Sequence, residues 1–450
     1  MAVVGLVAGC VNLQPQYERP AAPVAAQFPF AGGAAGQSAR EREWQQFFAD
    51  PRLQRLIELS LANNRDLRVA VLNIEATRAQ LGLRRADEWP TVNLAAQGAR
   101  QPGTNGRLSS TYSVGFAVAS YELDLFGRVR SLEDAAAAQL AGSEEARKAA
   151  QISLVASVGN TYYALRADDE LIGLTERTLA TREESMRLVQ LRFDNGVASE
   201  LDLRQAQSLV EAARVALVQQ RRQRALDTNA LELLLGQPMP PDLPGAQDWT
   251  AQTLPDVPAG LPSEVLLRRP DVRQAEQQLI AANANIGAAR AAFWPRISLT
   301  ASIGTASSEL SGLFKGTAWT FAPQLLMPIF DAGRNRANLQ ASKTARDIAM
   351  AQYERSIQAA FRDVSDALAG RATLQEQLRA QQAQAEAEEV RYRLSSLRFE
   401  HGAASSLDVL DAQRSLFVAQ QAALQTQLLL TQNRITVYRA LGGGWTDLPP

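Results

Sequence analysis

Residues 192–207 read Arg192-Phe-Asp-Asn-Gly-Val-Ala-Ser-Glu-Leu-Asp-Leu-Arg-Gln-Ala-Gln207. A similar sequence is repeated without a gap at residues 398–413, which read Arg398-Phe-Glu-His-Gly-Ala-Ala-Ser-Ser-Leu-Asp-Val-Leu-Asp-Ala-Gln413. Nine of the sixteen positions are identical. Gly196 and Gly402 can adopt the left-handed conformation that follows the end of a helix. The serine three residues after each glycine can cap a second helix, with an aspartate in the capping-box position. Each stretch therefore predicts a tight hairpin between two helices.

Two further pairs of segments show that the hairpin belongs to a longer internal repeat. Residues 66–96 match 271–301, and each segment contains a Trp-Pro pair that ends a helix and begins an extended run. Gly127-Arg128-Val-Arg130 returns as Gly333-Arg334-Asn-Arg336. The order helix, strand, strand, long helix, hairpin, helix is thus predicted twice. The first repeat covers 51–236 with its hairpin tip at 192–202, and the second covers 263–441 with its tip at 398–408.

The longest predicted helices span 128–193 and 334–399. Proline is absent from Gly103 to Gln237 and from Ile329 to Leu448, and both stretches are rich in helix-favouring residues. At about 1.5 Å per residue, each helix would be on the order of 100 Å long. A heptad stripe in the helices that follow predicts lateral packing into a helical barrel. Its positions are Leu203, Val210, Leu217 and Leu231 in the first repeat, and Val409, Leu416, Ala423, Leu430 and Val437 in the second.

Four short segments with alternating side chains predict strands at about 91–100, 112–124, 296–306 and 317–329. The alternation is typical of a membrane barrel with apolar side chains facing lipid, and a soluble sheet packed on helices shows it too. No run of 18 apolar residues occurs, so a transmembrane helix is excluded on length. Four strands cannot close a barrel, because the smallest membrane barrels need about eight. Several chains must therefore contribute to one barrel.

The composition argues against catalytic and nucleic-acid-binding functions. The formal net charge is -1, so no strong positive field points to nucleic acid. The only cysteine is Cys10 and the only histidine is His401. A disulfide framework, a Cys/His zinc site and a Cys–His nucleophile pair are therefore all but excluded. We expect neither an enzyme nor a bound metal or cofactor.

The first ten residues are apolar and end in Leu6-Val7-Ala8-Gly9-Cys10. Small residues directly before a cysteine resemble a bacterial lipobox, in which signal peptidase cuts before a lipid-modified cysteine. Residues 1–9 would then be the remainder of a signal peptide that lacks its basic start. The alternative, a buried cysteine, is disfavoured because the Pro-, Ala- and Gly-rich stretch that follows offers no core. We expect a covalent lipid on Cys10 and an extended segment over 10–50.

Five motifs carry a family resemblance: Ala-Asn-Asn-Arg-Asp-Leu-Arg (62–68), Tyr-Glu-Leu-Asp-Leu-Phe-Gly-Arg (121–128), Leu-Leu-Arg-Arg-Pro-Asp-Val (266–272), Leu-Asp-Ala-Gln-Arg-Ser-Leu-Phe (410–417) and Ala-Leu-Gly-Gly-Gly-Trp (440–445). Together they resemble the TolC-type outer-membrane efflux factors, in particular the OprM-like lipoprotein branch. The resemblance implies a mixed α/β membrane protein. In it, a trimer forms a 12-stranded antiparallel β-barrel, continuous with a long α-helical coiled-coil barrel. An equatorial linker over 237–262 and a C-terminal tail over 442–450 would complete each chain.

The function implied by the resemblance is a passive exit duct in the outer membrane. The homotrimer would work with a periplasmic adaptor and an inner-membrane pump of the resistance-nodulation-division class, and would contact outer-membrane lipids. Its cargo would be drugs or other small toxic compounds. A metal-ion duct of the same family is an alternative, and so is an envelope coiled-coil scaffold. An outer-membrane hydrolase would depend on His401.

The site residues implied by the resemblance lie at the hairpin tips. Leu407 and Asp411 match positions that form a hydrophobic ring and an acidic ring across the pore, and the first repeat places Leu201 and Gln205 there. Three Asp411 carboxylates around an axis would raise each other's pKa. The alternative for Asp411 is a solvated helix face, and for His401 an exposed turn residue. The residues expected to contact the adaptor are Asn195, Gly196, Val197, His401, Gly402 and Ala403.

Overall fold

The computed structural model describes residues 12–30, 39, 42–102, 108–245, 254–259 and 266–445. The predicted signal remnant and Cys10 lie outside these residues. The chain forms two compact units. Unit 1 comprises residues 1–22, 71–146 and 271–356, and unit 2 comprises 23–70, 147–270 and 357–450. Among the described residues, no helix is both long enough and apolar enough to span a membrane.

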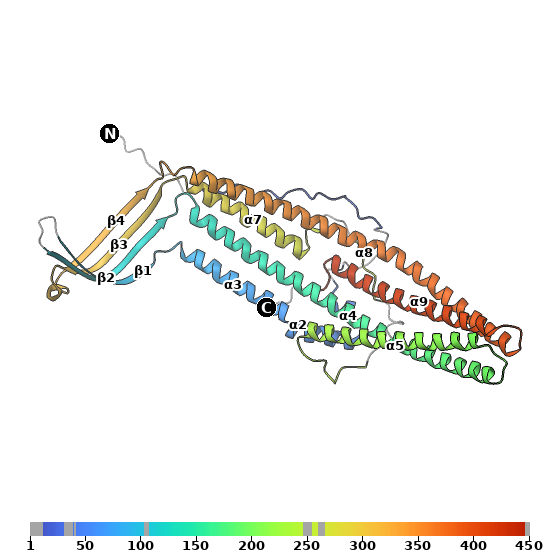
Figure 1. The fold of residues 1–450 in the computed structure, drawn as a ribbon. Helices are drawn as coiled ribbons and strands as arrows, with labels where there is room; N and C mark the ends of the chain where they lie inside the picture. The colour runs from blue at the N-terminus through green and yellow to red at the C-terminus, as the bar shows by residue number, and fades with distance from the viewer. Residues whose placement is uncertain are drawn as a thin grey trace. The chain divides into compact units, whose positions relative to one another are not determined.

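The elements follow one another in the predicted order (Figure 1). Two helices of 67 residues dominate the chain, and each is one residue longer than expected. The mixture of long helices with four antiparallel strands confirms the predicted fold class. The helices are α1 (Trp44–Phe47), α2 (Pro51–Asn63), α3 (Arg65–Ala86), α4 (Arg128–Asp194), α5 (Glu200–Leu235), α7 (Pro270–Ala291), α8 (Arg334–Glu400) and α9 (Ser406–Ala440), and a short 3-10 turn, η1, covers Leu310–Gly312. The strands are β1 (Val92–Pro102), β2 (Leu108–Leu123), β3 (Arg296–Ser307) and β4 (Thr317–Leu326).

The sheet of unit 1 has the order β1-β2-β3-β4, with every neighbouring pair antiparallel. Its register gives the two faces different chemistry. One face carries the cross-strand row Leu94, Phe116, Ile303 and Trp319, whose side chains are 58–74% exposed. The neighbouring row, on the other face, is Ala95, Gly115, Gly304 and Ala318. The predicted alternation thus separates large apolar side chains from small ones.

Two facing glycines set the closest approach between strands β2 and β3. Gly115 and Gly304 are register partners. A Cβ on Gly115 would lie 2.4 Å from the carbonyl oxygen of Ile303, and one on Gly304 would lie 2.2 Å from that of Val114. Real Cβ atoms do not approach backbone this closely, so both positions need a residue without a side chain.

An extended segment over residues 12–19, which we call the strap, is fastened to α7 inside unit 1. Arg290 donates to the carbonyl of Leu13 (3.1 Å) and Asn283 donates to that of Pro15 (2.8 Å). The guanidinium of Arg19 donates hydrogen bonds to both carboxylate oxygens of Glu276, at 2.6 and 3.0 Å. These three residues of α7 follow one another at intervals of seven positions. Glu276 is buried. The strap therefore runs antiparallel to one face of α7.

Unit 2 has its aromatic core beside the start of α2 and the end of α9. Phe47 stacks on Tyr438 with ring centroids 4.0 Å apart. Asp50, buried before α2, caps that helix by accepting from the backbone N–H of Arg52, and it also accepts from the hydroxyl of Tyr162 at 2.6 Å. Most of the predicted heptad positions are buried in the single chain: Leu203, Val210, Leu217 and Leu231 on α5, and Val409, Leu430 and Val437 on α9.

Candidate functional site

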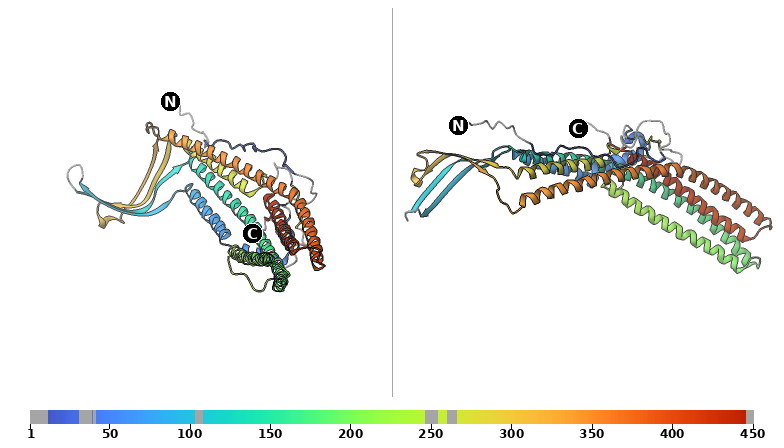
Figure 2. Two further views of the ribbon diagram at one scale, coloured as in Figure 1. Left: turned by 45° about the vertical axis from the view of Figure 1, so that its right-hand side comes forward. Right: turned by 90° about the horizontal axis from the view of Figure 1, so that it is seen from above.

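Both hairpin tips have the predicted local structure, which explains why the helices reverse there. Gly196 and Gly402 each have φ +73°, the left-handed conformation of a helix end. Each serine and aspartate of the capping pair, such as Ser405 with Asp408, forms the full reciprocal box. The hairpin of α4 and α5 lies side by side with that of α8 and α9 in both views of Figure 2. Repeated sequence has therefore produced repeated local geometry.

The residues expected to contact an adaptor are all on the surface of the single chain. Asn195, Gly196 and Val197 are exposed on the first tip, and His401, Gly402 and Ala403 are exposed on the second. Leu201 and Leu407, the pseudo-equivalent residues expected at the pore, are 67% and 52% exposed. Apolar side chains this exposed at a tip are available for contact with another chain or copy.

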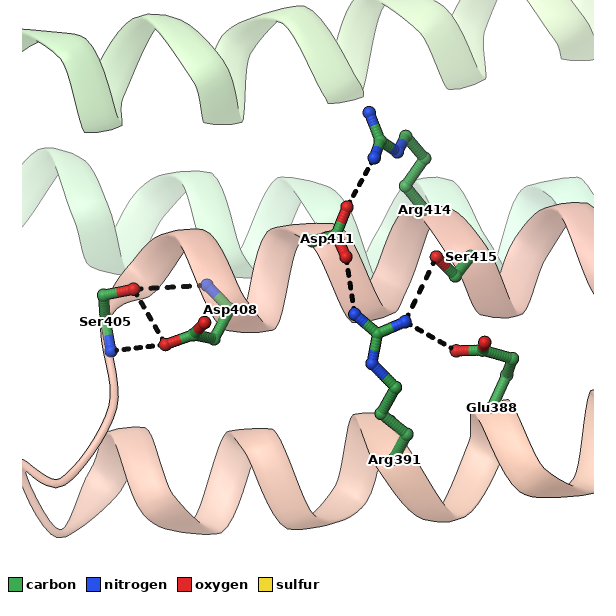
Figure 3. A network of polar contacts seen from close by, with 7 residues as sticks. All are labelled: Glu388, Arg391, Ser405, Asp408, Asp411, Arg414 and Ser415. Atoms are coloured by element: carbon green, nitrogen blue, oxygen red, sulfur yellow. Dashed lines mark hydrogen bonds and ion pairs between the residues drawn. The ribbon is translucent and has the colours of Figure 1, made fainter.

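Asp411 lies at the centre of a charged network on the second hairpin (Figure 3). Its Oδ2 accepts from Nη2 of Arg391 on α8 at 2.5 Å, and its Oδ1 accepts from Arg414 one turn along α9. Arg391 also bonds Glu388 at 3.1 Å. The carboxylate is thus held by two guanidinium groups of its own chain.

The electrostatics of this network differ from the expectation for a bare acidic ring. The hydrogen bond from Arg391, with the positive charges of Arg414 and Arg391, holds the pKa of Asp411 below its usual range. Mutual repulsion of three copies would act in the opposite direction. Within one chain, Asp411 is therefore a firmly ionised carboxylate at neutral pH.

The network has no counterpart in the first repeat. The residues pseudo-equivalent to Arg391, Asp411 and Arg414 are Ser185, Gln205 and Ser208. The prediction that the two tips differ at Gln205 and Asp411 thus extends to two arginines that the sequence reasoning missed. Arg414 could have been found from its spacing of three residues from Asp411 on one helix. Arg391 could have been found because it lies as many residues before the turn residue His401 as Asp411 lies after it. A tight hairpin at His401 therefore brings these two residues to the same level on the paired helices.

The two hairpins of one chain are also fastened to each other. Ser406 donates to Oδ1 of Asp202 at 2.7 Å, and Arg192 lies over the ring of Phe399, 4.6 Å from its centroid. Gln413 donates to Ser185 at 2.8 Å. Beneath these contacts lies a buried apolar cluster of Val189, Leu203, Ala206 and Leu410.

One carboxyl group further along the first hairpin is strongly perturbed. Burial and the nearby carboxylate of Asp227 on α5 raise the pKa of Asp168 on α4 to about 7. Its neighbour Asp169 instead pairs with Arg224 at 2.6 Å. Asp168 therefore keeps its proton to a higher pH than an ordinary carboxyl group does. Among the described residues, no group of three or more His, Cys, Asp or Glu side chains is arranged to hold a metal ion.

The fold places the chain in a structural class, that of outer membrane channels. The open state of the MtrE outer membrane channel of Neisseria gonorrhoeae superposes with a TM-score of 0.90 at 44% sequence identity, covering 96% of this chain and 98% of that one.

Sequence comparison then identifies the family. The model of the family described as outer membrane efflux protein matches residues 56–237 and 261–443, one match for each repeat. The antibiotic efflux pump outer membrane protein ArpC of Pseudomonas putida and the toluene efflux pump outer membrane protein TtgC of the same species are each 49% identical over 462 residues, covering 99% of this chain and 95% of theirs. The chain belongs to the outer membrane efflux protein family. It is an outer membrane component of an efflux pump, and members of this family are channels rather than enzymes.

Proposed function

We propose that three copies of this chain assemble into a passive duct through which a pump expels antibiotics and organic solvents. The observation that carries the proposal is the two-faced sheet. Large apolar side chains are exposed on one face and small ones on the other, which suits a wall between lipid and an aqueous interior. In the described part of one chain, β1 and β4 are each paired along one edge only. Joining β4 of one copy to β1 of the next satisfies those edges.

The proposed partners follow from the same architecture. The long helices of the three copies continue the duct away from the membrane, and the exposed tips around Gly196 and Gly402 meet a periplasmic adaptor. The adaptor connects the duct to an inner-membrane pump of the resistance-nodulation-division class. The proposed cargo is supported by the names of relatives that are 49% identical, an antibiotic pump protein and a toluene pump protein.

We place the gate at the second hairpin, where Leu407 and Asp411 of three copies face the pore axis together with Leu201. Leucine side chains would form an apolar constriction and the carboxylates a selective ring for cations. The arginine contacts of Asp411 hold the hairpin in one arrangement, so the gate opens when those contacts rearrange.

Deleting the chain from cells that express its pump should raise the intracellular accumulation of the pump's antibiotic substrates. The reason is that the pump then has no exit through the outer membrane. Accumulation of a fluorescent substrate and the minimum inhibitory concentration measure the effect, with restoration by the intact chain as the control. Unchanged accumulation with an active pump and adaptor present would rule out the efflux duct. A scaffold without a duct would in addition show no single-channel conductance when purified into a planar bilayer.

Cys10→Ser should abolish incorporation of radiolabelled palmitate, because the thiol of Cys10 is the proposed lipid attachment point. The same immunoprecipitated band from the intact chain is the positive control. Since Cys10 is the only cysteine, label retained by the variant would mean that the lipobox interpretation is mistaken. The strands and helices remain intact in this variant, so we expect the trimer still to form.

A further inference from the structure

A cavity of about 200 Å³ inside unit 2 is lined by residues of α4, α8 and α9. Arg177 and Arg182 both line this cavity, and none of the described residues around it is acidic. The hydroxyl groups of Thr178, Thr181 and Tyr392 lie in the same wall, and each can donate a hydrogen bond. The cavity therefore brings positive charge and hydrogen-bond donors together.

Arg182 is buried in the wall of this cavity without a countercharge. The residue is 4% exposed. Its Nη1 donates to the carbonyl of Leu209 at 2.9 Å, and its guanidinium lies over the ring of Phe417, 5.1 Å from the centroid. Its Nε is buried and has no hydrogen-bond partner among the described residues. A guanidinium is always ionised in proteins and has five N–H donors, so these contacts leave both its charge and part of its donor capacity unsatisfied.

The carboxylates next to Arg182 on α4 are engaged by other arginines. Glu183 pairs with Arg214 at 2.8 Å, and Glu184 pairs with Arg187. Burial lowers the pKa of Arg182, which is the direction expected for a cation that is taken out of water. A buried charge without a partner is strongly destabilising. An anion from outside the chain would therefore stabilise this arrangement.

The donors in the wall favour a small oxyanion. The parallel N–H groups of a guanidinium match two oxygens of one anion, and hydroxyl groups can donate to the remaining oxygens. Phosphate and sulfate present four oxygens in a tetrahedron, whereas chloride has a single centre. A cavity of about 200 Å³ has room for one such oxyanion with a few ordered waters.

We propose that this cavity binds a free inorganic oxyanion, for which phosphate is the probe, beside the guanidinium of Arg182. The anion supplies the countercharge that the chain lacks at this position, and it links α4 to α8 and α9. One chain forms the whole site, so the site does not depend on the proposed trimer or on the efflux duct. Because the anion binds the folded state, the stability of unit 2 rises with its concentration.

Titration of the full-length chain, purified in detergent without phosphate, tests the proposal. Isothermal titration calorimetry at constant ionic strength should show saturable binding of phosphate, and the unfolding temperature should rise as phosphate is added. Sulfate should act in the same way, because it has the same shape and number of oxygens. Chloride should not. Glycerol phosphate, which represents phosphate esters as another source of the anion, should compete weakly, because its carbon atoms have to fit between the same three helices.

Two variants remove the site in different ways. Arg182→Gln removes the buried charge and should weaken phosphate binding at least about tenfold, because hydrogen bonds to a charged group are lost. Gln413→Glu places a carboxylate in the cavity wall, where Gln413 is buried. This carboxylate can pair with Arg182 in place of the anion, so phosphate binding should be lost although the arginine is kept.

Arg221→Gln is the matched control for the loss of a positive charge. Arg221 is on α5, is 59% exposed and pairs with Glu176 at 2.8 Å, and it is not among the described residues that line the cavity. Phosphate binding by this variant should equal that of the parent. A loss of binding as large as that in Arg182→Gln would mean that the anion responds only to net charge, and would overturn the site.

Four further results would overturn the proposal. An absence of saturable phosphate binding by the parent would remove the site. Equal effects of phosphate and chloride would mean charge screening instead of an oxyanion site. Competition by glycerol phosphate as strong as that by phosphate would contradict a free anion as the ligand. Retained binding in both Arg182→Gln and Gln413→Glu would place the anion elsewhere on the chain. The efflux duct is tested separately by substrate accumulation, so these results leave it unaffected.

Discussion

Asp411→Ala should raise the leak conductance of the closed channel in planar bilayers. The variant removes the acceptor that holds Arg391 and Arg414, so α8 and α9 lose a link beside the proposed gate. One exposed ion pair is worth only about 0.2–1 kcal/mol, but three copies of the gate lose it together. The equilibrium between closed and open states should therefore shift by roughly a few-fold to a hundredfold toward the open state.

Gln205→Ala is the matched control, because Gln205 is pseudo-equivalent to Asp411, while serines stand at the positions of Arg391 and Arg414 in the first repeat. We expect the closed-state conductance of this variant to equal that of the parent. If Asp411→Ala also left the closed-state conductance unchanged, Asp411 would have no role in the gate.

The same network predicts how the gate depends on pH. Because the pKa of Asp411 is lowered in the folded chain, its contribution is fully present above the usual carboxyl pKa and is lost only as the pH falls through the lowered value. The leak should therefore stay constant from neutral pH down to about pH 5. A steep rise in conductance between pH 7 and about pH 5 would point to another titrating group.

Gly304→Val should prevent assembly of the sheet, which is the largest structural effect we expect from a single substitution. A side chain at this position would meet the backbone of Val114 and Gly115 on the neighbouring strand, so the two strands would have to separate. Separation breaks the ladder between β2 and β3, and unpaired backbone groups are not tolerated in a membrane. Membrane fractionation and size-exclusion chromatography in detergent should show little trimer.

Ala306→Val is the control for this prediction. Ala306 is on the same strand, two residues further on, and its register partner is Ser113. It already carries a Cβ, so the substitution enlarges a side chain without forcing backbone apart. Normal amounts of trimer from Gly304→Val would show that the strands can adjust, and the close approach of the glycines would then not be needed for assembly.

Much of the fold could be predicted because the signals that decide it are local. The long helices end within one residue of the expected positions because no proline interrupts them and a glycine follows each end. Strand ends were less predictable. β2 begins at Leu108, before the alternation becomes regular, and β4 contains Pro323 and ends at Leu326. Pro323 is the register partner of Leu299 on β3, and it has no backbone N–H to donate to a strand ladder.

The candidate site was only partly predictable, because its contacts join distant segments. Asp411 was expected from a motif, but its contact with Arg391 depends on how two helices lie against each other after the turn. The strap was expected only as an extended stretch. The strap contacts three residues of α7 that differ in chemistry: Glu276, Asn283 and Arg290. Their spacing of seven residues puts them on one face of the helix, but it does not predict which other segment of the chain binds that face.

The strap and the part of α7 that it contacts also match in length. From Leu13 to Arg19 an extended chain covers about 20 Å, and from Glu276 to Arg290 a helix covers about 21 Å. One extra or missing residue between Pro15 and Arg19 would put the guanidinium of Arg19 out of phase with the carboxylate of Glu276. The number of residues between the contacts of the strap therefore fixes the register in which it lies along α7.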